Sequence, residues 1–138
     1  MEPWGTRSSS LGRHIEVLDR DTCLALLAAT VVGRVAWSVP GGRLEVLPVN
    51  YVLDGDDLVF RTSRDDRVTT GAPMSFEVDE VEPALHAGWS VLVQGHAEIV
   101  EEPGEIRRLE ELAGAPWVAF LEPVFIRLRS DDIVGRRL

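Results

Sequence analysis

A short run of arginine and hydroxyl side chains ends one of the strand-like segments of the chain. Arg61, Thr62 and Ser63 form the run, and Arg64 and Arg67 follow just beyond it. Guanidinium and hydroxyl groups are donors that hold phosphate oxygens in proteins, so this run is a candidate phosphate site. The same residue types are also common at solvated strand ends, and the run taken alone favours that simpler interpretation.

The other residues of chemical interest carry weaker signals. The single cysteine, Cys23, excludes an internal disulfide and a cysteine-based metal cluster. The three histidines, His14, His86 and His96, show no metal-ligand spacing, so no metal site is expected. The acidic run at residues 77–82 is typical of a solvated strand edge.

Charge and composition limit the partners of the protein. The 138 residues carry a formal net charge of −9, so nucleic acid is not an expected partner because its phosphates would be repelled. All 14 basic residues are arginines, so any cationic contact with an anion must use a planar guanidinium. The apolar run at residues 23–32 is too short to span a membrane. We therefore expect a cytoplasmic protein that binds neither nucleic acid nor a membrane.

The hydrophobic pattern predicts one mainly β domain that positions these residues. Residues 1–12 are rich in Ser, Gly and Arg and are expected to form a disordered arm, which leaves residues 13–138 as the domain. A helix is predicted to begin after the N-cap Asp19 and to end at Gly33. A second helix is predicted at 103–112. Strands are predicted at 34–39, 44–53, 58–62, 74–81, 89–100 and 124–129, with a further candidate at 131–138.

Several of these segments are apolar on both faces. Segment 44–53 is one example, and a sheet with one wet face would not need that pattern. The second apolar face must be covered by helices or by another subunit. A closed barrel that pairs with a second copy along its side would cover this face and hide its strand edges. We therefore expect a homodimer.

The order and spacing of several motifs resemble the pyridoxamine 5'-phosphate oxidase family. The resemblance covers about residues 17–138 and is more specific for the fold than for the reaction. It rests on GRVAW at 33–37, LPVNYV at 47–52, LVFRTS at 58–63, FEVDE at 76–80, GWSV at 88–91, FIRLR at 125–129 and IVGRR at 133–137.

The resemblance implies a six-stranded antiparallel split β-barrel with short flanking helices, a homodimer, and a small-molecule site at the subunit interface that holds FMN. It places the FMN phosphate near Arg61, Thr62 and Ser63, with Arg67 as a basic partner. The shorter loop between Ser63 and Gly71 departs from the family, whose members usually carry a helix-forming stretch there. Its two aspartates, at positions 65 and 66, would repel a phosphate.

The resemblance also implies which residues approach the flavin ring. Pro48, Val49 and Asn50 match the strand beside the ring, and the Asn50 amide both donates and accepts hydrogen bonds. A solvent-facing Asn50 is an equal alternative. Trp89 and Ser90 match a stretch that reaches the flavin from the partner subunit. Packing in the core or the interface is the stronger interpretation for Trp89. Gln94 lies on the same face as Ser90 and is a further candidate.

Two functional hypotheses follow from these residues. The first is a flavin-dependent oxidoreductase, in which the flavin transfers hydride or electrons and the protein holds the ring against a substrate. The second is a non-catalytic split-barrel dimer that has lost FMN or binds another ligand, such as F420 or haem. The short loop with its aspartates favours the second hypothesis, and the family motifs favour the first.

Overall fold

A computed structural model of the protein describes residues 15–138. The predicted arm at residues 1–12 lies outside the described part. The helices are α1 (Arg20–Ala29) and α2 (Pro103–Ala113), and short 3-10 turns occur at η2 (Arg64–Asp66) and η3 (Pro83–Leu85). The strands are β1 (Glu16–Leu18), β2 (Val32–Ser38), β3 (Leu44–Asp54), β4 (Asp57–Ser63), β5 (Pro73–Glu82), β6 (Ala87–Val100) and β7 (Pro123–Arg137).

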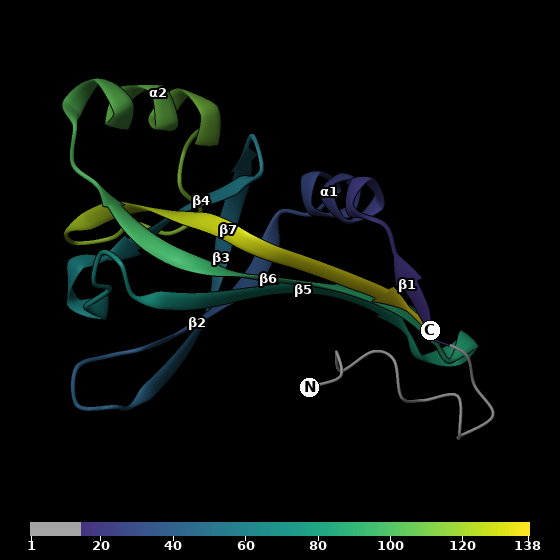
Figure 1. The fold of residues 1–138 in the computed structure, drawn as a ribbon. Coiled ribbons are helices and arrows are strands. Elements are labelled where there is room, and N and C mark those ends of the chain that lie inside the picture. The colour runs from purple at the N-terminus through teal and green to yellow at the C-terminus, as the bar shows by residue number, and fades with distance from the viewer. Residues whose placement is uncertain (1–14) are drawn as a thin grey trace.

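Six of the strands form a closed antiparallel barrel (Figure 1). Their order is β7-β4-β3-β2-β5-β6, and β6 pairs with β7 to close the ring. This architecture confirms the six-stranded barrel that was predicted. The short strand β1 was not predicted. It adds to the end of β7, where Glu16 pairs with Arg137.

The seam between β6 and β7 is the longest pairing in the barrel. Alternate residues of β6, such as Val91 and Val93, are fully buried, as the predicted alternation requires. The two late strands of the prediction are one strand, because β7 continues through an irregularity opposite Gln94 and Gly95. Ser130 lies at this point, and its backbone N–H donates to Asp57 Oδ1 at 3.1 Å. This hydrogen bond gives the Ser130 N–H a partner at the point where the β6–β7 register shifts. Strand β7 therefore continues past the shift.

Helix α1 closes one end of the barrel. Asp19 caps it as predicted, since its carboxylate accepts a hydrogen bond from the Thr22 N–H at 2.8 Å. Cys23 and Leu27 are buried in the barrel core, and burial raises the pKa of the Cys23 thiol, which suits packing rather than reactivity. The prediction that Gly33 ends this helix is wrong. The helix ends at Ala29, because the β-branched residues that follow favour an extended chain.

The reason for a glycine at position 33 is close packing inside the barrel. Gly33 lies in β2, and a Cβ atom there would overlap the ring of Phe76. That ring also makes an edge contact with Tyr51, at 4.7 Å between centroids. The Tyr51 hydroxyl donates to the carbonyl oxygen of Leu27 at 2.6 Å, and burial raises the pKa of Tyr51 to about 12. These contacts join α1 to the barrel interior.

Helix α2 covers the outside of the barrel at β4. The predicted helix is confirmed and is one residue longer, and Glu102 caps it by accepting from the backbone N–H of the next turn. Its buried residue Leu109 packs with Val59, Val100 and Phe125 in a second hydrophobic cluster outside the barrel. Figure 1 shows α2 above the β4 end of the molecule and α1 nearer β1. No helix within residues 15–138 is long and apolar enough to cross a membrane.

Candidate functional site

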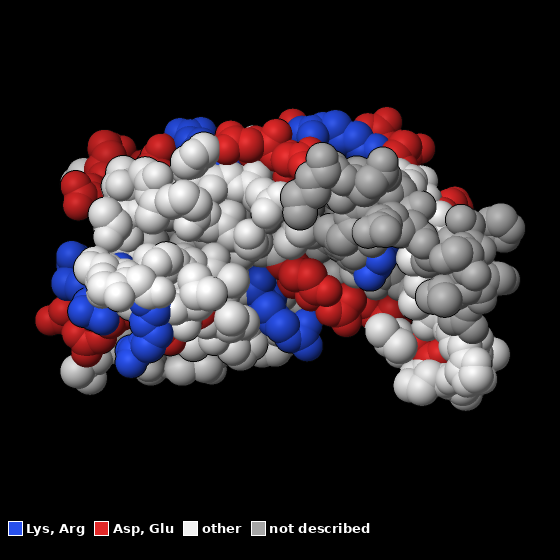
Figure 2. Space-filling view, turned by 60° about the horizontal axis from the view of Figure 1, so that its bottom comes forward, with Lys and Arg blue, Asp and Glu red and all other residues white. Residues whose placement is uncertain are grey.

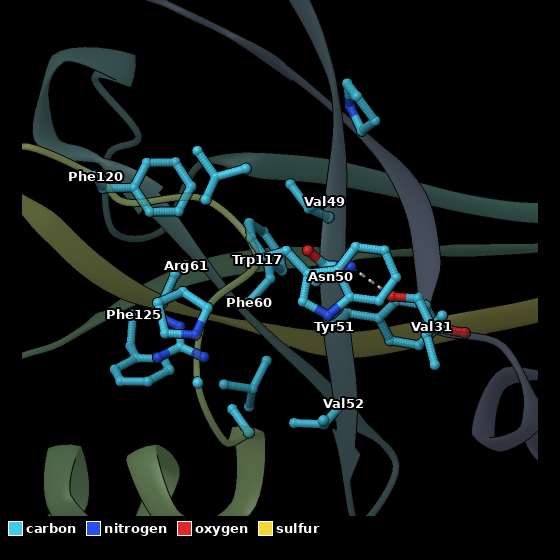
Figure 3. A pocket seen from close by; sticks show the side chains of 16 residues that line it. Val31, Val49, Asn50, Tyr51, Val52, Phe60, Arg61, Trp117, Phe120 and Phe125 are labelled. Atoms are coloured by element: carbon cyan, nitrogen blue, oxygen red, sulfur yellow. Dashed lines mark hydrogen bonds between the residues drawn. The ribbon is translucent and has the colours of Figure 1, made fainter.

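A cavity of about 190 Å³ lies on the outer face of β3 and β4 (Figure 3). Residues 114–122, which we call the strap, connect α2 to β7 and form one wall of this first cavity through Trp117 and Phe120. Strand alternation explains the opposite wall. The side chains of Val49 and Tyr51 are buried inside the barrel, so Asn50 between them points outward.

Asn50 and Arg61 meet in this first cavity, although they were predicted to contact different parts of a ligand. The Asn50 side-chain N–H donates to the Val31 carbonyl at 3.4 Å, which leaves its side-chain oxygen as an acceptor. Pro48 and Val49 line the same cavity. Pro48, Val49 and Asn50, which were predicted to lie beside a flavin ring, therefore line the same cavity as Arg61.

Arg61 fastens the strap to the barrel. Its Nη2 donates to the carbonyl oxygen of Gly114 at 2.7 Å, and its guanidinium carbon lies 5.0 Å from the centre of the Phe125 ring. Such a cation–π contact adds to the hydrogen bond in holding the side chain. A guanidinium has five N–H donors, so Arg61 retains donors for an anion.

The other predicted phosphate residues do not converge on Arg61 within one chain. Thr62 follows Arg61 on β4, so its side chain points the opposite way and is buried in the barrel. The backbone N–H of Ser63 donates to Asp66 Oδ2 at 2.9 Å, and its hydroxyl accepts from the Asp65 N–H at 3.3 Å. The polar groups of Ser63 are therefore engaged in shaping the loop.

Arg67 lines a different cavity, of about 140 Å³, between β2, β3 and η2. It adopts a left-handed conformation with φ 54° and shares this cavity with Asp65, Asp66 and Trp37. The Trp37 side chain is buried, and among the described residues its indole N–H has no hydrogen-bond partner. The structure of one chain thus places Arg61 and Arg67 in separate cavities.

The residues predicted to act from a partner subunit lie on β6, away from the first cavity. Trp89 is half-buried beside Arg137 at the start of the strand. Ser90 and Gln94 lie on the outer face of β6, since Val91 and Val93 point inward. None of these three lines the first cavity of its own chain, so their predicted contact with a flavin remains a prediction about a second copy.

A second and larger cavity, of about 670 Å³, lies beside the first. Arg61, Phe120 and Phe125 line both cavities, and Arg64 lines the second. Sequence reasoning missed the strap that separates them, because it has no periodicity. The concentration of Pro, Trp and Phe directly after Gly114 was the available signal, since large aromatic residues are uncommon in loops that only connect elements.

The outer face of β2 and β5 carries a charged cluster of Arg34, Glu77 and Asp79. The Arg34 Nη1 lies 3.5 Å from Glu77 Oε1 and 3.3 Å from Asp79 Oδ2. Burial and the neighbouring Asp79 carboxylate raise the pKa of Glu77 to about 7, and Arg34 opposes the shift. The predicted solvated edge is correct for the exposed Glu80 but not for Glu77, which lies in a shallow groove.

The buried Thr62 hydroxyl leads to a prediction about stability. Its Oγ1 has no partner among the described residues, and an unpaired buried hydroxyl is destabilising. We expect Thr62→Val to leave the free energy of unfolding unchanged or to raise it by up to about 1 kcal/mol. Thr30→Val is the matched control, because its hydroxyl donates to the Leu26 carbonyl at 2.8 Å, and it should lose about 1 kcal/mol. Urea denaturation measures both, and a clear loss in Thr62→Val would show that its hydroxyl is bonded in solution.

Comparison with known proteins identifies a family and several structural relatives. The family model described as pyridoxamine 5'-phosphate oxidase matches residues 19–137. An uncharacterized protein of Mycobacterium tuberculosis, Rv0080, is 28% identical over 147 residues, which cover 100% of this chain and 95% of that protein.

Two solved structures show the same fold over most of their length. A candidate pyridoxamine 5'-phosphate oxidase from Corynebacterium glutamicum is 28% identical, with a TM-score of 0.75 over 90% of this chain and 93% of the other. A protein of Mycobacterium smegmatis described as FAD-binding is 25% identical, with a TM-score of 0.72 over 88% of this chain and 98% of the other.

Proposed function

Because the chain belongs to the pyridoxamine 5'-phosphate oxidase family, we propose that it is a flavin-binding protein whose bound flavin performs redox chemistry on a small molecule. The observation that carries the proposal is the first cavity, where Asn50, Arg61 and the aromatic residues of the strap meet. A flavin needs a flat apolar wall, hydrogen bonds at the polar edge of the ring and a cation near its phosphate. This cavity offers aromatic side chains, one side-chain amide and one guanidinium.

The fit is good at the ring and incomplete at the phosphate. Trp117 and Phe120 offer flat walls, and the Asn50 side-chain oxygen is available to accept a bond from the ring. Near the phosphate, one chain contributes the spare donors of Arg61, whereas Arg67 lies in the cavity with Asp65 and Asp66. FMN, the flavin that the sequence predicts, therefore remains a proposal that rests on Arg61.

We further propose that two copies of the chain complete the site. A volume of about 190 Å³ is below the roughly 300–1,000 Å³ typical of ligand pockets, so one chain encloses only part of a flavin. The outer face of β2 and β3 carries exposed Val32, Leu44 and Val46, and a second copy packed there would bury them. Figure 2, in which the lower side of Figure 1 comes forward, shows a broad area of uncharged residues with charged residues in its middle and around its edges.

In the proposed mechanism the flavin supplies hydride or electron transfer, and the protein residues hold it. Asn50 would orient the ring edge through its amide, and Arg61, near the end of β4, would neutralise phosphate charge. The strap covers one side of the cavity and would shield the reacting atoms from water. Among the described residues no acid–base pair lines the first cavity, which suits chemistry performed by a cofactor.

The flavin proposal predicts a measurable affinity that depends on Arg61. The purified protein should bind flavin, and Arg61→Met should weaken binding by about one to two powers of ten, because a charge-assisted contact contributes roughly 1.5–3 kcal/mol. Arg20→Met is the matched control, since Arg20 is exposed on α1 and pairs with Asp56. Absorbance between 300 and 550 nm and titration calorimetry measure the outcome. A wild-type protein that binds no flavin at high concentration would contradict the proposal and favour a non-catalytic barrel.

The dimer proposal predicts a defined mass and a variant that disrupts it. Light scattering at micromolar concentration should give about twice the 15.3 kDa of one chain. An obligate interface buries on the order of 2,000 Å² or more, so an arginine in its centre should separate the copies. Val46→Arg should therefore give a monomer, whereas Val17→Arg, on the exposed strand β1, should not. A wild-type particle of 15.3 kDa would rule out the dimer.

A further inference from the structure

We propose that the pairing of two copies is controlled by a proton at Glu77, so that the neutral side chain favours the dimer and the ionised side chain weakens it. This inference rests on the dimer proposed above and adds a way of regulating it. Glu77 and Val46 line the same groove, of about 390 Å³, on the outer face of β2, β3 and β5. Val46 belongs to the apolar face that is proposed to meet a second copy, so a copy that buries Val46 also covers Glu77.

The charges in this groove are unbalanced. The neighbours of Glu77 along β5, Phe76 and Val78, are fully buried, so its side chain points outward. Asp79 lies on the same outer face, two residues further along the strand. Arg34 lies opposite Glu77 on β2, and its Nη1 is 3.5 Å from Glu77 Oε1 and 3.3 Å from Asp79 Oδ2. Two carboxylates therefore share one guanidinium, which leaves a net charge of −1 when both are ionised.

No other charged group that lines the groove compensates this charge. The remaining residues that line it are uncharged: Ala36, Val46, Ser75, Phe76 and Leu92. His96 lies further along the outer face of β6, where its Nδ1 is 2.7 Å from Asp131 Oδ2. On β7, Arg136 lies opposite Ser90, and that residue separates it from Asp79. The balance in the groove is therefore set by its own three charged side chains.

A proton on Glu77 removes the imbalance. Burial and the neighbouring Asp79 carboxylate raise the pKa of Glu77 to about 7, while Arg34 opposes the shift. A single chain near neutral pH therefore holds this proton part of the time. A protonated carboxyl donates a hydrogen bond, which the Asp79 carboxylate accepts. The contact between like charges then becomes a hydrogen bond, and Arg34 balances the one negative charge that remains.

A second copy would make this proton more important. Two copies related by a two-fold axis use the same surface patch, so both clusters are covered at once. In one chain the side chains of Glu77 and Asp79 are 34% and 33% exposed, and that of Arg34 is 59% exposed. Water therefore still solvates part of their charge. Removing this water is costly for an uncompensated charge and less costly for a balanced cluster.

The direction of the pH dependence follows from this difference. Burial in the dimer raises the pKa of Glu77 above its value of about 7 in one chain, so the pairing of two chains takes up protons. The dimer should be tightest below about pH 7 and should weaken as the pH rises through the pKa that Glu77 has in the dimer. Two protons are taken up per dimer, so the dissociation constant can rise by up to about 100-fold per pH unit in this range. Because two copies are proposed to complete the flavin site, the same proton would limit flavin binding at alkaline pH.

The test measures the dissociation constant of the full-length dimer at two pH values. The sequence has no lysine, so an amine-reactive dye labels only the α-amino group. Fluorescence-detected sedimentation of a dilution series should give a dissociation constant at least about tenfold higher at about pH 8.5 than at about pH 6.5. Circular dichroism at both pH values checks that the fold is retained.

Glu77→Gln isolates the proposed group. Glutamine keeps the shape of the side chain, is neutral at both pH values and can donate to Asp79. The dissociation constants of this variant should therefore agree within about threefold. Glu80→Gln is the matched control, since Glu80 is exposed on the same strand and does not line the groove, and it should keep the wild-type dependence. Asp79→Asn is a second variant, which leaves one carboxylate for Arg34 and should reduce the rise.

The outcomes separate this inference from the dimer that it rests on. A wild-type dissociation constant that is the same at both pH values, or a Glu77→Gln variant that keeps the full rise, would overturn control by Glu77 and leave the dimer intact. A wild-type particle of 15.3 kDa at both pH values and micromolar concentration would overturn both proposals. Loss of the rise in Glu80→Gln would also overturn control by Glu77, because general surface charge would then set the pH dependence.

Discussion

Arg127→Met should lower the free energy of unfolding by about 3–5 kcal/mol, the cost typical of removing one partner from a buried ion pair. The Arg127 side chain is 7% exposed, and its Nη2 lies 2.8 Å from both Asp54 Oδ2 and Glu105 Oε1. Its Nη1 lies 3.6 Å from Asp57 Oδ2. Methionine would keep the packing of the stem but leave these carboxylates facing one another. Urea denaturation followed by circular dichroism measures the change.

The dependence of the free energy of unfolding on pH, in the acid range, provides a second measurement on the same variant. Hydrogen bonds from Arg108 and Arg127 lower the pKa of Asp54 to about 2 from its ordinary value of 3.8. A depressed carboxyl pKa contributes stability above pH 3.8 that is lost as the pH falls through about 2. Without Arg127 the pKa of Asp54 should rise. The free energy of unfolding of the variant should then fall less steeply as the pH is lowered.

The matched control for Arg127 is another arginine of β7. Arg129 pairs with Glu98 and Asp57 but is 55% exposed, so Arg129→Met should cost about 1 kcal/mol or less. Equal losses of unfolding free energy in Arg127→Met and Arg129→Met would contradict the view that burial determines how much the loss of an arginine destabilises the protein. Glu105 lies in the first turn of α2 and the strap follows that helix, so a loosened Arg127 network should also reduce ligand affinity.

Gly95→Ala is the second variant with a large expected effect. A Cβ atom at this position would overlap the backbone carbonyl oxygen of Arg129, at the register shift where β6 meets β7. Backbone cannot move aside as a side chain can, so the seam must separate locally. Overpacking typically costs about 1–3 kcal/mol and occasionally more, and we expect the upper end or outright failure to fold.

Gly104→Ala is the control, because the substitution is the same and the surroundings differ. Its nearest neighbours are the Glu102 carboxylate oxygens at 3.1 Å, which belong to a flexible side chain. Alanine has the higher helix propensity, by about 1 kcal/mol, so this variant should be as stable as wild type or more stable. Thermal unfolding of the two variants side by side would test the contrast. A Gly95→Ala protein with the wild-type melting temperature would show that the seam is not tightly packed.

The parts of the fold that the sequence predicts correctly are those set by local patterns. Alternation in β6 and the Gly55 turn between β3 and β4 depend on neighbouring residues, so both were predictable. The role of Gly33 depends on Phe76, more than forty residues away, and no local signal distinguishes a packing glycine from a helix-ending one. The continuity of β7 depends likewise on Asp57, which bonds Ser130 from another strand.

In the candidate site, too, some features depend on neighbouring residues and others on contacts between residues far apart in the sequence. Asn50 and Arg61 were predicted as site residues, and the structure places them in one cavity, while their contact with a ligand stays a prediction. The grouping of Arg61 with Thr62 ignored strand alternation, which sends their side chains to opposite faces. The strap was missed because its position depends on the Arg61–Gly114 bond, a contact across more than fifty residues.

The position of β7 has a consequence for how the protein is made. This last strand pairs with β4, β6 and β1, and its final residues pair with the first described strand. A nascent chain therefore cannot close the barrel while β7 is still inside the ribosome, and β6 and β4 emerge with open edges. Long-range pairing of this kind folds slowly and exposes strands that can aggregate. Strand β7, at Pro123–Arg137, must therefore have left the ribosome before the cavities on this barrel can form.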